Sequence, residues 1–237
     1  MYLKREKDFA NSVKCAIILR KDVPFKNKKG GFSMNKIITI TRQYGSGGRE
    51  IGQKLAEKFG IKFYDHELIS RAAKESGFSE VTFEKAEQKA SHSLLYSLVM
   101  GINSYGSQDF GFSSLSLDDK IFLAQSDVIR KVAGEGPCVI VGRCADYILK
   151  EKENVVSIFL QADLQYRIER ATQLYNISAQ KAAEEVVKMD KRRANYYNYH
   201  TNEKWGFSGN YDMVLRTDLT TLDEVVDIIA NFVEKVK

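Results

Sequence analysis

The chain has few of the residues that build disulfide frameworks and metal sites. Its 237 residues include three cysteines and three histidines, which are Cys15, Cys138, Cys144, His66, His92 and His200. Three cysteines form no even set of disulfides, and neither residue type has the spacing of a metal site or a catalytic triad. This cysteine usage is typical of a reducing compartment, so we predict a cytoplasmic protein.

The sequence also lacks a long hydrophobic run near its start. The longest apolar stretch within residues 1–33 is 15–19, which is too short for a signal-peptide core and for a membrane span. We detect no internal repeat and no low-complexity tract. We therefore expect no membrane partner.

Outside its first 33 residues the chain lacks an excess of positive charge. The whole sequence has 36 basic and 31 acidic residues, for a net charge of +5, and nine basic and three acidic residues fall in 1–33. Residues 34–237 therefore carry 27 basic and 28 acidic side chains. Because the basic surplus belongs to the leader, charge indicates no nucleic-acid partner for the folded part.

The leader, residues 1–33, has two interpretations. Residues 28–33 read Lys-Lys-Gly-Gly-Phe-Ser just before Met34, and Lys-Gly-Gly can be encoded by the purine-rich stretch that bacterial ribosomes recognise upstream of a start codon. Met34 is then the true start and the leader is not native. The alternative is a native basic arm, whose lack of periodicity predicts disorder. In both cases we predict a single folded domain over 34–237.

A glycine-rich loop follows the first predicted strand. Residues 36–41 are β-branched and apolar, residues 42–52 read Arg-Gln-Tyr-Gly-Ser-Gly-Gly-Arg-Glu-Ile-Gly, and apolar residues then recur at helical spacing up to Gly60. This order directs a helix N-terminus and several backbone N–H groups at one point, which is an anion site. The alternative is a plain turn without a ligand, although a plain turn does not need four glycines among eight residues.

The loop lacks the lysine of the standard phosphate-binding loop. In that motif the second glycine is followed by Lys, which reaches the transferring phosphates, and by Ser or Thr, which holds Mg²⁺. After Gly47 these positions hold Gly48 and Arg49, with Glu50 next.

The remaining segments alternate between strands and helices. We predict strands at 61–64, 137–142, 155–160 and 211–215, helices at 66–100, 121–133, from 163, at 178–199 and from 221, and loops at 101–116 and 200–210. About five strands that alternate with helices predict an α/β fold with a doubly wound parallel sheet and ligands at the carboxyl ends of its strands.

Two later segments carry candidate phosphate-binding arginines. Gly142-Arg143-Cys144-Ala145-Asp146 follows a predicted central strand, so Arg143 should face the same crevice as the glycine loop. The alternative is a solvated arginine paired with Asp146. In Met189–Tyr197, one helical face carries Asp190, Arg193 and Tyr197, and a neighbouring face carries Arg192 and Tyr196. A charged helix end is the alternative there.

The block 37–65 and residues 139–146 resemble the cytidylate-kinase-like family of P-loop nucleoside monophosphate (NMP) kinases, and the resemblance extends from Met34 to the C-terminus. It implies a P-loop NTPase sheet, a helical NMP-binding insertion at about 66–135 and a lid at about 190–209. It also implies transfer of phosphate from ATP, with Mg²⁺, to CMP or dCMP. The residues themselves indicate neither the acceptor base nor the oligomeric state.

The resemblance also implies roles for individual residues. Arg143 would contact the acceptor monophosphate, and Arg192 and Arg193 would close over the phosphates with the lid. The predicted substrate-binding residues are Asp65, Arg143, Asp146 and Asp190. An N-cap is the alternative for Asp65. Arg167 and Arg170 would be lid-base arginines or, alternatively, part of a solvated helix face.

Placing the family's loop over residues 42–50 puts Gly48 on the lysine and Glu50 on the hydroxyl residue. Arg49 could supply the charge, and Glu50 or Asp65 could hold Mg²⁺. The predicted cofactor-binding residues are Gln43, Tyr44, Gly45, Ser46, Gly47, Gly48, Arg49, Glu50 and Arg192, and the predicted catalytic residues are Arg49, Arg143 and Arg193. We expect nucleotide binding to survive the loss of the lysine better than turnover. A kinase for CMP or another small acceptor and a nucleotide-binding sensor or interaction module without phosphotransfer are the two function classes that fit.

Overall fold

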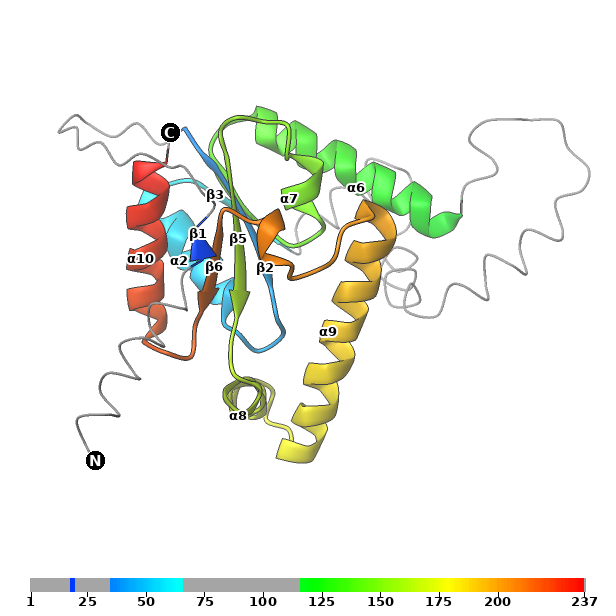
Figure 1. The fold of residues 1–237 in the computed structure, drawn as a ribbon, viewed down its shortest axis with the longest axis vertical. Coiled ribbons are helices and arrows are strands. Elements are labelled where there is room, and N and C mark those ends of the chain that lie inside the picture. Colours follow the sequence, from blue (N-terminus) through cyan, green and yellow to red (C-terminus); the bar gives the residue numbers. More distant parts are fainter. Residues whose placement is uncertain (1–17, 20–34, 66–115, 237) are drawn as a thin grey trace, which may run out of the picture.

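The protein forms a three-layer α/β structure around a parallel sheet (Figure 1). The computed structural model describes residues 18–19, 35–65 and 116–236. The strands are β1 (Ile18–Leu19), β2 (Ile37–Arg42), β3 (Lys62–Tyr64), β4 (Cys138–Val141), β5 (Val155–Gln161) and β6 (Met213–Arg216). They follow the order β1-β6-β5-β2-β4-β3, in which all neighbours are parallel except β1, which pairs antiparallel with β6.

Helices cover both faces of this sheet. They are α2 (Gly48–Phe59), α6 (Leu117–Gly134), α7 (Ala145–Ile148), α8 (Leu164–Tyr175), α9 (Ala179–Thr201) and α10 (Leu222–Lys235), with a 3-10 turn at Ser208–Asn210. Figure 1 shows α2 and α10 on one face, α6 and α7 on the other, and α8 beyond the carboxyl ends of the strands. The predicted doubly wound sheet of five parallel strands is confirmed.

Alternating side chains of β2 divide the core between the two faces. Ile38 and Ile40 pack in the core with residues of α2 and α10, whereas Ile37 packs with residues of α6. Successive side chains of a strand point to opposite faces, and all three isoleucines are fully buried. A strand that is apolar on both sides occupies the centre of such a sheet, which places the carboxyl end of β2 in the middle of the molecule.

Several helix ends lie where local sequence signals predict them. Asp163, Ser178 and Thr221 are N-caps whose side chains accept hydrogen bonds from backbone N–H groups, and Thr221 with Glu224 forms a complete capping box. Gly60 ends α2 in the left-handed conformation, with φ of 63°. The helix predicted at 178–199 is confirmed as α9, which continues to Thr201, so most of the predicted lid at 190–209 is helical.

Some predictions fall outside the described residues. These are the helix at 66–100, the loop at 101–116 apart from Ser116, and most of the insertion at 66–135, of which α6 is described. Within the leader only β1 is described, so its interpretation stays a prediction. Among the described residues, no helix combines the length and the apolar character needed to cross a bilayer.

Candidate active site

A cavity lies at the carboxyl ends of three adjacent strands. Arg42 ends β2, Asp65 follows β3, and Arg143 follows β4 after one glycine. These residues line a cavity of about 420 Å³ whose opposite wall includes five residues of α9, which are Met189, Arg192, Arg193, Tyr196 and Tyr197. The topology thus brings together four segments that are far apart in the sequence, as expected at the carboxyl edge of a parallel sheet.

The predicted glycine loop adjoins this cavity and is tied down by hydrogen bonds. Gln43 Oε1 accepts from the Ala162 N–H at 3.0 Å, and the Tyr44 N–H donates to Asp190 Oδ1 at 2.7 Å. The carbonyl of Ser46 accepts from the Thr217 hydroxyl at 2.8 Å. Gln43, Tyr44 and Ser46 therefore hold the shape of the loop.

The start of α2 supplies the anion-binding donors of this loop. Gly47 is the N-cap, with φ of 80° and no side-chain cap, and the first bond across the helix start runs from the Ile51 N–H to the Gly47 carbonyl at 2.9 Å. The N–H groups of Gly48, Arg49 and Glu50 thus have no acceptor within the helix, and the helix dipole favours an anion beside them. These three N–H groups are the donors that the predicted backbone cradle would use.

A buried ion pair supports the loop from α8 and α9. Arg167 Nη1 lies 2.5 Å from Asp190 Oδ2, and the two side chains are 8% and 17% exposed. Arg167 also donates to the carbonyls of Ala162 and Tyr44. The solvated alternative for Arg167 is wrong, because its side chain points inward at the loop. Asp190 does not line the cavity, so its predicted substrate contact becomes a supporting role.

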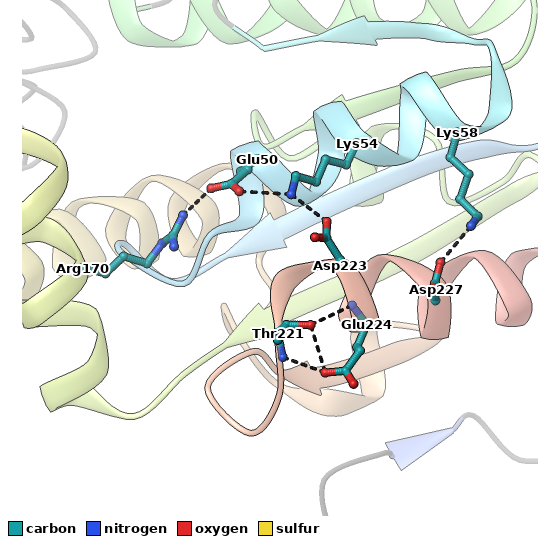
Figure 2. A network of polar contacts seen from close by, with 8 residues as sticks. All are labelled: Glu50, Lys54, Lys58, Arg170, Thr221, Asp223, Glu224 and Asp227. Carbon is teal, nitrogen blue, oxygen red and sulfur yellow. Dashed lines mark hydrogen bonds and ion pairs between the residues drawn. The ribbon is translucent and has the colours of Figure 1, made fainter.

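A second pair joins α8 to the start of α2. Arg170 Nη2 lies 2.5 Å from Glu50 Oε2, and Glu50 Oε1 lies 3.5 Å from Lys54 Nζ (Figure 2). Both partners of Glu50 are cations that a divalent ion would have to displace, so the geometry disfavours the predicted metal role. Arg170 lies against the loop, and its buried Nε has no hydrogen-bond partner among the described residues. The solvated alternative for Arg170 is wrong as well.

The turn after β4 presents Arg143 on a strained backbone. Gly142, Arg143 and Cys144 have φ angles of 84°, 60° and 56°, which is unusual for residues with side chains. Such strain persists where the surrounding structure fixes it, and it is often found at ligand sites. The turn places Arg143 at the cavity, as the position after a central strand predicts.

Asp146, by contrast, points into the protein. Its carboxylate accepts hydrogen bonds from the Thr41 hydroxyl at 3.1 Å and the Tyr197 hydroxyl at 2.8 Å, and the residue is only 5% exposed. Burial raises the pKa of Asp146, and the two hydrogen bonds oppose that shift. Asp146 therefore connects β2 to α9, and the geometry does not support its predicted contact with substrate.

Arginines crowd the wall between the loop and Arg143. Arg193 Nη1 donates to the Arg42 carbonyl at 3.0 Å, and its guanidinium lies 5.4 Å from the centre of the Tyr44 ring. Burial and the charge of Arg193 lower the pKa of Arg42 to about 9, and the nearby carboxylate of Asp65 acts in the opposite direction. Burial likewise lowers the pKa of Arg193. A bound polyanion would relieve this electrostatic cost.

Arg49 lies at the margin of this cluster. Its side chain is 68% exposed and its Nε donates to Asp65 Oδ2 at 2.9 Å, and it is not among the residues that line the cavity. Asp65 also lies 3.7 Å from Arg42 Nη2. Asp65 therefore faces the arginines, and the helix that it was expected to cap lies outside the described residues.

Arg42 and Trp205 are among the cavity residues that sequence reasoning missed. Arg42 lies at the centre of the cluster and Trp205 contributes to the far wall. A sequence signal for Arg42 did exist. Arg42 stands five positions before Gly47, where the standard motif has its first glycine, so an arginine there is a departure from the motif. Trp205 had no such signal in the sequence, because the position of its indole depends on packing against Phe159.

Comparison with known proteins indicates one family. The profile of the cytidylate kinase-like family matches residues 37–219. A cytidylate kinase of Pyrococcus horikoshii is 26% identical over 198 residues, which cover 81% of this chain and 85% of that protein. A cytidylate kinase of Methanopyrus kandleri is 25% identical over 211 residues, with coverage of 84% and 93%.

A solved structure shares the fold. An uncharacterized protein from Eubacterium ventriosum superposes with a TM-score of 0.63 at 27% identity, over 84% of this chain and 98% of that one. The likeness therefore covers most of both chains rather than a single motif.

Proposed function

Because the chain belongs to the cytidylate kinase-like family, we propose that it transfers a phosphoryl group from ATP to a nucleoside monophosphate, with CMP or dCMP as the first candidates. The observation that carries the proposal is the cavity wall, where four arginines stand with a single carboxylate, Asp65, among the described lining residues. Phosphoryl transfer requires concentrated positive charge, because its loose transition state spreads negative charge over three oxygens.

In this proposal the donor and acceptor phosphates bind at different parts of the site. The N–H groups at the start of α2 would hold the donor phosphates, and Arg143 would hold the acceptor phosphate through a bidentate guanidinium contact. Arg193, from α9, lines the same cavity, donates to the Arg42 carbonyl and would stabilise the charge that develops during transfer. Mg²⁺ takes one or two carboxylates together with phosphates and water. Asp65 is the carboxylate of the described cavity lining, and it would provide such a ligand once its ion pair with Arg49 opens, which is the same kind of cost that disfavours Glu50. When bound, Mg²⁺ would neutralise phosphate charge.

The decisive experiment couples ADP release to a spectroscopic readout in the presence of Mg²⁺ and a panel of monophosphates (CMP, dCMP, UMP, AMP and GMP). We expect one or two acceptors to stimulate ADP release strongly. Arg143→Ala should reduce that turnover at least about 100-fold. The matched control is Arg130→Ala, which removes an exposed arginine of α6 outside the cavity. Absence of stimulation by any monophosphate would contradict the kinase proposal.

A second function is favoured by one observation. The lysine position of the loop holds Gly48. The hydroxyl position holds Arg49 in the standard motif, and Glu50 when the family's loop is used for the alignment. The two side chains that usually promote transfer are therefore missing. A nucleotide-binding module would then bind ATP without transfer. Calorimetry with ATP, followed by the turnover assay, separates the two functions, because the module predicts tight binding and no stimulated ADP release.

A further inference from the structure

We infer, on the premise of the phosphoryl transfer proposed above, that Arg42 replaces the missing lysine of the loop. The two positions have exchanged their side chains. The position that normally holds the first glycine carries an arginine, and the lysine position carries a glycine. Arg42 would then contact the transferring phosphoryl group as a catalytic residue.

The exchange can be read directly in the sequence. The standard motif has a glycine, four residues of any type, a second glycine and then lysine. With Gly47 as the second glycine, the first position falls on Arg42 and the lysine position on Gly48. A cation has therefore moved from the start of α2 to the end of β2, six residues earlier.

The packing shows why both changes belong together. A methyl group added to Gly48 would lie 2.7 Å from Arg42 Cβ and 2.7 Å from Arg42 Cγ. The stem of Arg42 thus occupies the space into which a side chain at position 48 would extend. A lysine at position 48 and an arginine at position 42 exclude one another.

The head of Arg42 is guided by a second glycine. A methyl group on Gly142 would overlap Arg42 Nη1 and lie 3.2 Å from its Cζ. Gly142 has a φ of 84°, which a residue with a side chain rarely adopts. The guanidinium therefore passes between the loop and the turn that carries Arg143, where a phosphoryl group would move from donor to acceptor.

The surroundings leave Arg42 suited to an anion. Asp65 Oδ1 lies 3.7 Å from Arg42 Nη2, which is longer than a hydrogen bond, and Arg193 and Arg143 add positive charge nearby. Arg49, the other candidate to replace the lysine, is turned toward Asp65 and largely exposed. A planar guanidinium can donate to two phosphate oxygens at once, which a lysine ammonium does only as a point charge.

The test is an exchange of the two side chains in the full-length chain. Arg42→Gly should lower kcat at least about 100-fold. Gly48→Lys alone should also lower kcat strongly, because its stem collides with that of Arg42. The double variant Arg42→Gly/Gly48→Lys restores the first glycine and the lysine of the standard motif and should regain at least about tenfold in kcat over Arg42→Gly. Arg130→Ala is the control for loss of an arginine.

Binding measurements keep this inference separate from the kinase proposal. Calorimetry should show that Arg42→Gly binds ATP at least about tenfold more weakly than the wild type, while thermal unfolding shows that the variant is folded. If the wild type binds ATP without turnover, the kinase proposal fails. The ATP affinity of Arg42→Gly then still tests whether Arg42 contacts the phosphates. Wild-type kcat and ATP affinity in Arg42→Gly, or a double variant no more active than Arg42→Gly, would overturn the inference.

Discussion

The two sides of the glycine loop use arginine differently. On the side of α8, Arg167 and Arg170 each lie 2.5 Å from a carboxylate, Asp190 and Glu50. On the side of the cavity, four arginines share one lining carboxylate among the described residues. Arginines with matched carboxylates stabilise the fold, whereas an excess of guanidinium charge at a cavity indicates a polyanionic ligand. The comparison separates supporting residues from binding residues within one small region.

The largest effect should come from breaking the buried support. Asp190→Ala leaves the buried guanidinium of Arg167 without its carboxylate and removes the acceptor of the Tyr44 N–H. A loss of about 3 to 5 kcal/mol in the free energy of unfolding is expected. For a domain of this size that lowers Tm by at least about 6 °C, which calorimetry would measure. Asp227→Ala, which removes an exposed partner of Lys58, is the control. A Tm equal to that of the control would remove the distinction between the two sides.

On the cavity side the same kind of change should spare stability and reduce turnover. Arg193→Met keeps an apolar stem and removes a buried charge that repels Arg42. We expect kcat to fall about 100-fold, while Tm changes by less than about 2 °C. Coupled turnover and thermal unfolding of the same preparation provide both values. A fall in Tm like that of Asp190→Ala would place Arg193 among the supporting residues.

A polyanion that binds the cavity arginines should raise the Tm of the wild-type protein. Tripolyphosphate that binds the folded state at 100 times its Kd adds about 2.7 kcal/mol to the free energy of unfolding. The increase in Tm should shrink in Arg193→Met, because part of the positive charge is gone. The exposed control Arg130→Ala should show the full increase. Equal increases in all three proteins would mean that tripolyphosphate binds elsewhere.

The smallest effect is expected at Glu50. Its side chain is 44% exposed, so Glu50→Gln should change the free energy of unfolding by less than about 1 kcal/mol. Because its neighbours are Arg170 and Lys54, the Mg²⁺ concentration for half-maximal turnover should stay the same. A severalfold rise in that concentration would restore Glu50 as a metal ligand.

Much of the fold was predictable because its signals are local. Alternation of apolar strands and helices gave the five parallel strands, and the caps at Asp163, Ser178 and Thr221 mark helix starts through contacts within three residues. The glycine loop was visible for the same reason. Arg143 could be placed at the cavity because the carboxyl ends of parallel strands share one edge of the sheet.

The partners of the site residues were decided by tertiary structure. Thr41 meets Asp146 across 105 positions, Arg170 meets Glu50 across 120, and the Tyr44 N–H meets Asp190 across 146. No local pattern reveals such pairs. The sequence therefore could not show that these carboxylates support the fold and do not bind substrate. Folding alone brings them to the arginines.

The missing lysine shows the division most clearly. The sequence by itself determined that a glycine loop lies between a strand and a helix and that its lysine position holds Gly48. Only the tertiary structure showed that the stem of Arg42 fills the space beside Gly48 and that its head passes Gly142. The physical reason is steric. The side chain of Arg42 extends where its neighbours lack a Cβ atom, and one of these neighbours, Gly142, is distant in the sequence.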